Sequence, residues 1–124
     1  MLGIRNKDNF NTHYLKGGLF ESFIISELHK YIFNHKLNGK VYFFRDSNGN
    51  EVDVILEYSG VLKAIEIKSG KTIIPDFFKG LRYLDKVFKE IKFEKYLVYG
   101  GDNLQHRSQE QVLGWKHLTN IFIS

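Results

Sequence analysis

Apolar and polar residues along the middle of the chain follow the patterns of β-strands. Residues 40–45, 51–58 and 61–68 are rich in β-branched and aromatic side chains, which predicts three strands. Asn48-Gly49 separates the first two runs, and an Asn-Gly pair in that position is a strong hairpin signal. Ser59-Gly60 turns the second run into the third. These strands are expected to form an antiparallel meander.

The second run shows the alternation of a strand with one apolar face. Its apolar residues Val52, Val54 and Leu56 alternate with acidic residues, among them Asp53. Asp53 is therefore expected on the face opposite to the three apolar side chains.

Two segments have the 3.6-residue period of amphipathic helices. The first runs from about Leu19 to Phe33, and Gly17-Gly18 before it is a plausible boundary. The second spans Asp76 to about Ile91, with Pro75 limiting its start. The residues of this helix expected to face the sheet are Phe77, Leu81, Leu84, Phe88 and Ile91.

The rest of the chain completes the predicted fold. Residues 95–101 are expected to form a fourth strand, parallel to the third and joined to it through the second helix. Trp115 and Ile121-Phe122 hint at one more short strand. The order αβββαβ indicates an α/β protein with a mixed central sheet and flanking helices.

Composition limits the class of protein. The 124 residues are 43% hydrophobic, which predicts a single domain with one buried core. Cysteine is absent, so disulfides and thiolate sites are excluded and a reducing cytoplasm is expected. No stretch approaches the roughly 20 apolar residues of a membrane span, and no membrane partner is expected.

The charge of the chain is mildly basic. Its formal net charge of +4 is compatible with nucleic acid but too small to argue for it alone. A basic stripe along the second helix could contact phosphates. The favoured interpretation is that these side chains are simply solvated, because they lie opposite the apolar face of the helix. The stripe consists of Lys79, Arg82, Lys86 and Lys89.

Asp53, Glu66 and Lys68 form a candidate site on consecutive strands. Lys68 follows Glu66 by two residues, so both side chains leave the same face of the third strand. If they are buried, each must be paired or ligated. Two acids on adjacent strands can share Mg²⁺, which would activate water and neutralise charge at a phosphodiester. A lysine beside the metal could orient that water or stabilise the same charge.

Glu21 adds a third acid, because it falls inside the apolar arc of the first helix. Glu27 shares that arc, so periodicity does not single Glu21 out. Ordinary alternatives exist for each residue: a surface ion pair of Glu66 with Lys68, a helix-dipole role for Glu21, or a solvated Asp53. Each is more common than catalysis when taken singly, but the four residues together favour a site.

These residues resemble the PD-(D/E)xK nuclease signature, which has a helix glutamate, an aspartate on the second strand and ExK on the third. Glu21, Asp53 and Glu66-Ile67-Lys68 match it in order. The resemblance implies a restriction-endonuclease-like core. Val52 stands where the signature has proline, and the second helix lacks the glutamine of RecB-like nucleases.

A narrower resemblance covers nearly the whole chain. Several separate motifs are similar to the uncharacterised C-terminal domain of bacterial and archaeal AAA+ ATPases. They are Leu2-Gly3-Ile4, Gly18-Leu19-Phe20-Glu21, Glu27-Leu28, Phe44-Arg45-Asp46, Glu51-Val52-Asp53, Ile65-Glu66-Ile67-Lys68-Ser69 and Val98-Tyr99-Gly100-Gly101. The resemblance implies an upstream ATPase module, with residues 1–18 as a linker and 19–124 as the nuclease-like domain.

The expected function is metal-dependent hydrolysis of DNA. Asp53 and Glu66 would bind Mg²⁺ or Mn²⁺, Glu21 and Lys68 would assist catalysis, and Arg45 would contact a phosphate. The alternatives are a non-catalytic module that binds nucleic acid or protein for the ATPase, and a domain that mainly mediates oligomerisation. The chain carries no ATP-binding motif of its own, because Ile65 stands where a phosphate-binding loop ending at Ser69–Thr72 needs glycine.

Overall fold

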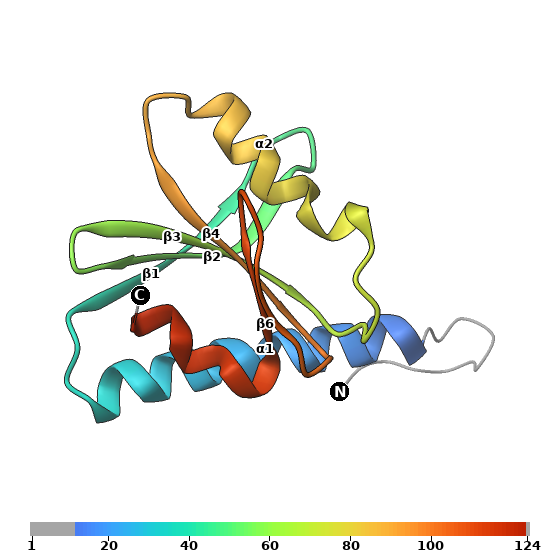
Figure 1. Ribbon diagram of the computed structural model, residues 1–124, viewed down its shortest axis with the longest axis horizontal. Helices are drawn as coiled ribbons and strands as arrows, with labels where there is room; N and C mark the ends of the chain where they lie inside the picture. The colour runs from blue at the N-terminus through green and yellow to red at the C-terminus, as the bar shows by residue number, and fades with distance from the viewer. Residues whose placement is uncertain (1–11, 124) are drawn as a thin grey trace.

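The computed structural model describes residues 12–123, in which a six-stranded mixed sheet carries helices on both faces (Figure 1). The elements in chain order are α1 (Thr12–Asn34), β1 (Gly39–Arg45), β2 (Glu51–Tyr58), β3 (Val61–Lys68), the 3₁₀ helix η2 (Pro75–Phe78), α2 (Lys79–Val87), β4 (Phe93–Tyr99), β5 (Leu104–His106), β6 (Gln111–Gly114) and the 3₁₀ helix η3 (Trp115–Phe122). None of the helices in residues 12–123 has the length and apolar character needed to cross a membrane.

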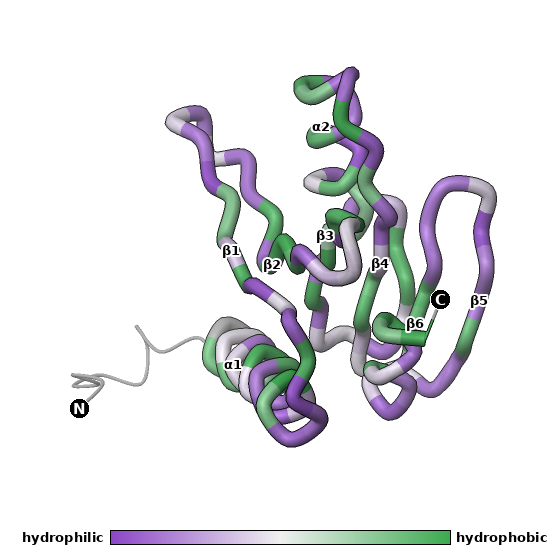
Figure 2. Tube along the Cα trace, turned by 90° about the vertical axis from the view of Figure 1, so that its left-hand side faces the viewer, coloured by the Kyte–Doolittle hydropathy of each residue, from purple (hydrophilic) through white to green (hydrophobic). Residues whose placement is uncertain are grey.

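The strand order across the sheet is β1-β2-β3-β4-β6-β5, which can be followed from left to right in Figure 2. β1, β2 and β3 form an antiparallel meander. β4 pairs in parallel with β3 and β6, and β5 returns antiparallel to β6. The mixed α/β class, the meander and the parallel crossover through α2 are therefore confirmed.

The sheet separates two apolar clusters. α1 and η3 cover one face, and α2 covers the other (Figure 1). Buried residues on the first face include Ile24, Leu28, Ile65, Leu118 and Ile121. Those on the second include Ala64, Phe78, Leu81, Leu84 and Leu97.

The two long helices differ from the sequence prediction at their ends. α1 begins at Thr12 instead of about Leu19, so Gly17-Gly18 lie inside the helix. The second helix opens with η2 at Pro75 and its α-helical part ends at Val87. Ile91 lies beyond that end and is 41% exposed, so its expected place facing the sheet is wrong.

The C-terminal segment was also predicted wrongly. Trp115 and Ile121-Phe122 belong to η3 and not to a strand. Leu118 and Ile121 are three residues apart, so one turn of a 3₁₀ helix brings both side chains to the same side. There they are buried in the cluster beneath α1. The two short strands before them, β5 and β6, were not expected.

A β-bulge interrupts the pairing of β1 with β2. Tyr42 pairs with Ile55, and Phe44 pairs with Val52. Asp53 and Val54 of β2 therefore lie opposite a single residue of β1, Phe43. Val52 consequently joins the α2 cluster, whereas Val54 joins the α1 cluster. The single apolar face expected for β2 is therefore wrong, because an extra residue in one strand reverses the side-chain alternation.

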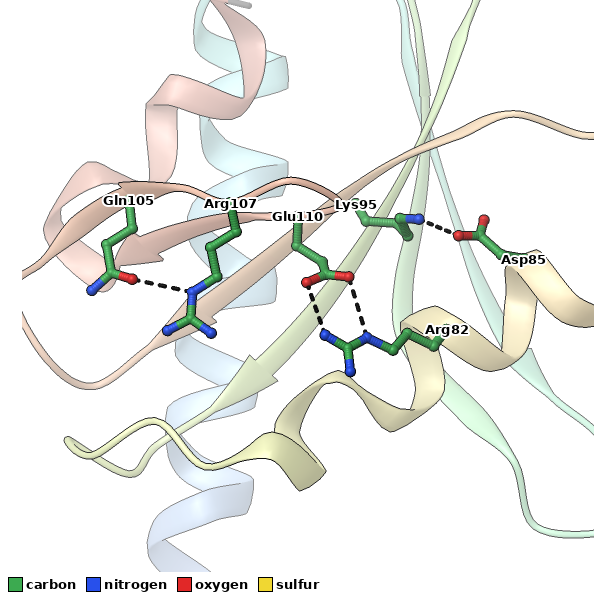
Figure 3. A network of polar contacts seen from close by, with 6 residues as sticks. All are labelled: Arg82, Asp85, Lys95, Gln105, Arg107 and Glu110. Atoms are coloured by element: carbon green, nitrogen blue, oxygen red, sulfur yellow. Dashed lines mark hydrogen bonds and ion pairs between the residues drawn. The ribbon is translucent and has the colours of Figure 1, made fainter.

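Polar contacts attach α2 to the sheet (Figure 3). Arg82 of α2 contacts Glu110, whose side chain is almost fully buried, and Asp85 pairs with Lys95 of β4. At the other end of the sheet, the Tyr83 hydroxyl donates to Asp46 in the β1–β2 turn. α2 is thus tied to both halves of the sheet.

Candidate functional site

A cleft of about 530 Å³ opens where the first half of α1 meets the end of β1, the start of β2 and the end of β3. Its lining comprises Gly17, Gly18, Glu21, Phe43, Phe44, Arg45, Glu51, Val52, Asp53, Ile67, Lys68 and Ser69. Four of the five residues predicted for the site line this cleft, and the fifth, Glu66, lies against Asp53 beside it.

Asp53 lies where β2 and β3 stop pairing. The register between the two strands runs only as far as Val54 opposite Ile65. Past that point the Asp53 carboxylate replaces the backbone ladder, because its Oδ2 accepts the Ile67 N–H at 2.7 Å. The bulge and this hydrogen bond together fix Asp53 in the gap between the strands.

Glu66 reaches Asp53 from the α2 side and is only 5% exposed. A Cβ added to Gly80 of α2 would lie 2.6 Å from Glu66 Oε2 and 2.4 Å from the Glu51 carbonyl oxygen. Only glycine therefore lets α2 pack here. Burial, followed by the hydrogen bond and charge of Asp53, raises the pKa of Glu66 to about 10.

Glu21 reaches Asp53 from α1. Partial burial raises the pKa of Glu21, and the charges of Asp53 and Glu51 and a hydrogen bond with Asp53 act in the same direction. Glu27, which periodicity could not distinguish from Glu21, instead pairs with Lys30 at 3.3 Å on the surface. Asp53 therefore contacts one glutamate from each face of the sheet.

Lys68 lines the cleft and is half-buried. Its charge lowers the pKa of both Glu21 and Glu66, partly offsetting the effects that raise them. Because Glu66 is buried, a solvent-exposed ion pair between Glu66 and Lys68 does not describe this arrangement.

Arg45 lines the cleft but has a partner. Its Nη2 and Nε donate to Glu51 Oε2 at 2.9 and 3.1 Å. The two side chains are 77% and 49% exposed, so the pair is a weak one that can be exchanged for another anion. In the predicted basic stripe, whose last member Lys89 lies beyond the end of α2 at Val87, Arg82 is likewise engaged by Glu110.

The sequence was compared with known proteins. Residues 16–118 match the family model described as "Domain of unknown function (DUF4143)". The chain belongs to this family. The matched range of the DUF4143 domain contains all five predicted site residues. No curated protein and no solved structure gave a significant match.

The carboxyl groups of this DUF4143 domain suit a small hard cation. Asp53 and Glu66 are in hydrogen-bond contact, which needs either a shared proton or a cation between them. Within residues 12–123, no group of three or more acidic or histidine side chains is placed to hold a metal ion. Asp53 at the cleft and the buried Glu66 beside it could nevertheless hold Mg²⁺, which commonly takes one or two carboxylates, substrate phosphates and water.

Three features of the DUF4143 domain were missed by sequence reasoning. They are the pairing of Glu51 with Arg45, the exposed ring of Phe43 and the close approach of Gly80 to Glu66. The cross-strand position of Arg45 and Glu51 follows from the hairpin register and could have been predicted. The other two depend on the bulge and on the placement of α2, for which the sequence carries no local signal.

Proposed function

We propose that this DUF4143 domain hydrolyses phosphodiester bonds in DNA with the help of Mg²⁺ or Mn²⁺. The observation that carries the proposal is the contact of Asp53 with Glu21 and with Glu66, from three elements, at a cleft that Asp53, Glu21 and Lys68 line and that Glu66 lies beside. Burying the Glu66 carboxylate against Asp53 is costly unless a proton or cation compensates.

The residues of the cleft have distinct roles in this proposal. Asp53 and Glu66 would hold the cation, which when bound supplies positive charge to a phosphate and lowers the pKa of water. Glu21 positions Asp53 through their hydrogen bond. Lys68 presents an ammonium group to the cleft, where it can orient the attacking water or stabilise negative charge. Arg45 would exchange Glu51 for a neighbouring phosphate.

The proposed fold relationship is a restriction-endonuclease-like core. Support comes from the element order α1-β1-β2-β3-α2-β4 and from the placement of Asp53 on β2 and Glu66-Ile67-Lys68 on β3. Both features agree with the PD-(D/E)xK resemblance.

The proposed setting is a cytoplasmic protein with an ATPase module upstream. It rests on the motif resemblance alone, and Leu2-Gly3-Ile4, which belongs to that resemblance, lies outside the described residues. The division into a linker (1–18) and a domain (19–124) stays a prediction, although α1 extends across that boundary.

The test is a cleavage assay on single-stranded, duplex and branched DNA with Mg²⁺, Mn²⁺ or EDTA. Asp53→Asn is the sharpest variant, because the asparagine oxygen can still accept the Ile67 N–H while the charge is lost. Lys68→Ala tests the second role. Glu57→Gln is the matched control, since Glu57 is an exposed acid on the same strand as Asp53.

We expect metal-dependent cleavage that both site variants reduce by at least about a hundredfold and that Glu57→Gln leaves intact. Cleavage that survives Asp53→Asn and Lys68→Ala would refute the assignment of the site. Nucleic-acid binding without cleavage in any metal would instead support the non-catalytic module.

A further inference from the structure

Phe43 is an exposed aromatic residue at the mouth of the cleft. Its side chain is 67% exposed and lines the same cavity as Asp53 and Lys68. Within the described part of the chain, its ring belongs to neither apolar cluster and stacks on no other ring. A single exposed apolar residue is common, so exposure alone does not indicate a function for Phe43. The case depends on the residues around it.

The local geometry ties Phe43 to the site. Phe43 follows Val41 by two residues and therefore leaves β1 on the face that α1 covers. The bulge residues Asp53 and Val54 lie opposite Phe43 on β2. The irregularity beside Asp53 thus also lies at the backbone position from which the ring leaves β1, and bulges beside active sites commonly redirect side chains in this way.

Two glycines of α1 contribute to the wall of the cleft beside Glu21. Gly17 and Gly18 of α1 line the same cavity as Phe43. A Cβ at Gly18 would meet no atom within 4 Å, and one at Gly17 only Ser69 Oγ at 3.9 Å. Glycine weakens a helix interior, and packing does not demand it here. The glycines therefore leave this part of the cleft open at a cost to α1.

We infer that Phe43 is a stacking platform for an unpaired nucleobase next to the phosphate held in the cleft. The inference rests on the proposed nucleic-acid substrate and narrows it to single-stranded or locally unpaired DNA. Aromatic rings bind bases by stacking with little dependence on sequence. A base within an intact duplex is already stacked on both sides and must first be unpaired and flipped out. Lys68 in the same cleft, and Arg45 once it exchanges Glu51 for a phosphate, supply positive charge for the backbone.

The experiment measures equilibrium binding of a short phosphorothioate oligodeoxynucleotide carrying 2-aminopurine. The single strand is compared with a blunt duplex of the same sequence, in Mg²⁺, with the whole chain. The variants are Phe43→Ala and Phe43→Trp. Phe33→Ala is the matched control, because Phe33 is 82% exposed on α1 and does not line the cleft.

We expect Phe43→Ala to weaken single-strand binding about 5- to 100-fold, the range that loss of one stacked base produces. Duplex binding should change less than about twofold, because an intact duplex offers no free base face to the ring. Quenching of 2-aminopurine should appear with the wild-type chain, persist with Phe43→Trp and disappear with Phe43→Ala. Phe33→Ala should behave as wild type.

Equal single-strand binding by the wild type and Phe43→Ala would overturn the inference. An equal loss of single-strand and duplex binding in Phe43→Ala would also overturn it. A change of oligomeric state in Phe43→Ala would overturn it as well, because the ring would then belong to an interface between copies of the chain. Because these readouts are binding readouts, they are separable from the proposed hydrolysis. Cleavage that is unchanged in Phe43→Ala would support the proposed hydrolysis but not the stacking platform. Binding that depends on Phe43 without any cleavage would support the stacking platform but not the hydrolysis.

Discussion

Asp53 contacts side chains on both faces of the sheet. Its Oδ2 accepts the Ile67 N–H, and its carboxyl group contacts Glu21 on the α1 side and Glu66 on the α2 side. Carboxyl groups in contact cannot all be ionised without a compensating charge. In the absence of a cation, a proton on Glu66, whose pKa is raised, relieves this repulsion.

A pH-dependent stability follows from Glu66. Its pKa is about 10 in the folded chain against 4.5 as a free side chain. The folded state therefore binds more protons between these values, so the free energy of unfolding should fall as pH rises through this window. One proton limits the slope to about 1.4 kcal/mol per pH unit. Chemical denaturation in EDTA at about pH 6 and about pH 9 measures it.

Glu66→Gln should remove this part of the pH dependence, because an amide does not ionise. Glu57→Gln, the exposed acid of the same sheet region, should retain it. If Glu66→Gln and the wild type lose stability equally with rising pH, Glu66 is not the buried protonated group described above.

Two glycines, one in each long helix, are expected to have opposite effects on stability when they are replaced by alanine. Gly18 lies in the interior of α1 with open space around it, whereas Gly80 lies against Glu51 and Glu66. Gly18→Ala should therefore stabilise the chain by about 1 kcal/mol through helix propensity. Gly80→Ala should destabilise it by about 1–3 kcal/mol through overpacking. Thermal unfolding of both variants measures these changes, and a Gly80→Ala variant that is as stable as the wild type or more stable would contradict the packing of α2 on Glu66.

The contact of α2 with the β5–β6 hairpin gives a second test on elements. Arg82→Met would leave the Glu110 side chain, which is 2% exposed, without its cation. An unpaired buried acceptor costs about 1–3 kcal/mol, and the same change removes the guanidinium 5.3 Å from the Phe78 ring. Lys86→Met, an exposed change on the same helix, should cost little. Equal denaturation midpoints for the two variants would show that Arg82 contributes no more than a surface lysine.

Elements with strong local signals could be predicted from the sequence. β2 and β3 have the predicted bounds because each is an apolar run enclosed by a turn signal. β5 and β6, with three and four residues, are too short for a periodic signal. The start of α1 was missed because Gly17-Gly18 resemble a helix boundary, yet the helix continues through them. The bulge at Asp53 arises from pairing with β1, which no local pattern records.

At the scale of the whole molecule, the cleft depends on both layers of helices. Glu21 comes from α1, the position of Glu66 depends on α2, and Asp53 lies in the gap of the sheet between them. All five residues predicted for the site could be named from strand order, spacing and resemblance. Their contacts could not, because these require the separation of β2 from β3 and the close approach of α2 at Gly80.

The central claim is that Asp53 and Glu66 hold a divalent cation in place of a proton. Calorimetric titration of Mn²⁺ at neutral pH, in two buffers of different ionisation enthalpy, measures the affinity and the protons released. We predict binding with release of about one proton. Glu66→Gln should release none, Asp53→Asn should bind much more weakly, and Glu57→Gln should match the wild type. Absence of binding, or binding that Asp53→Asn leaves unchanged, would contradict the claim.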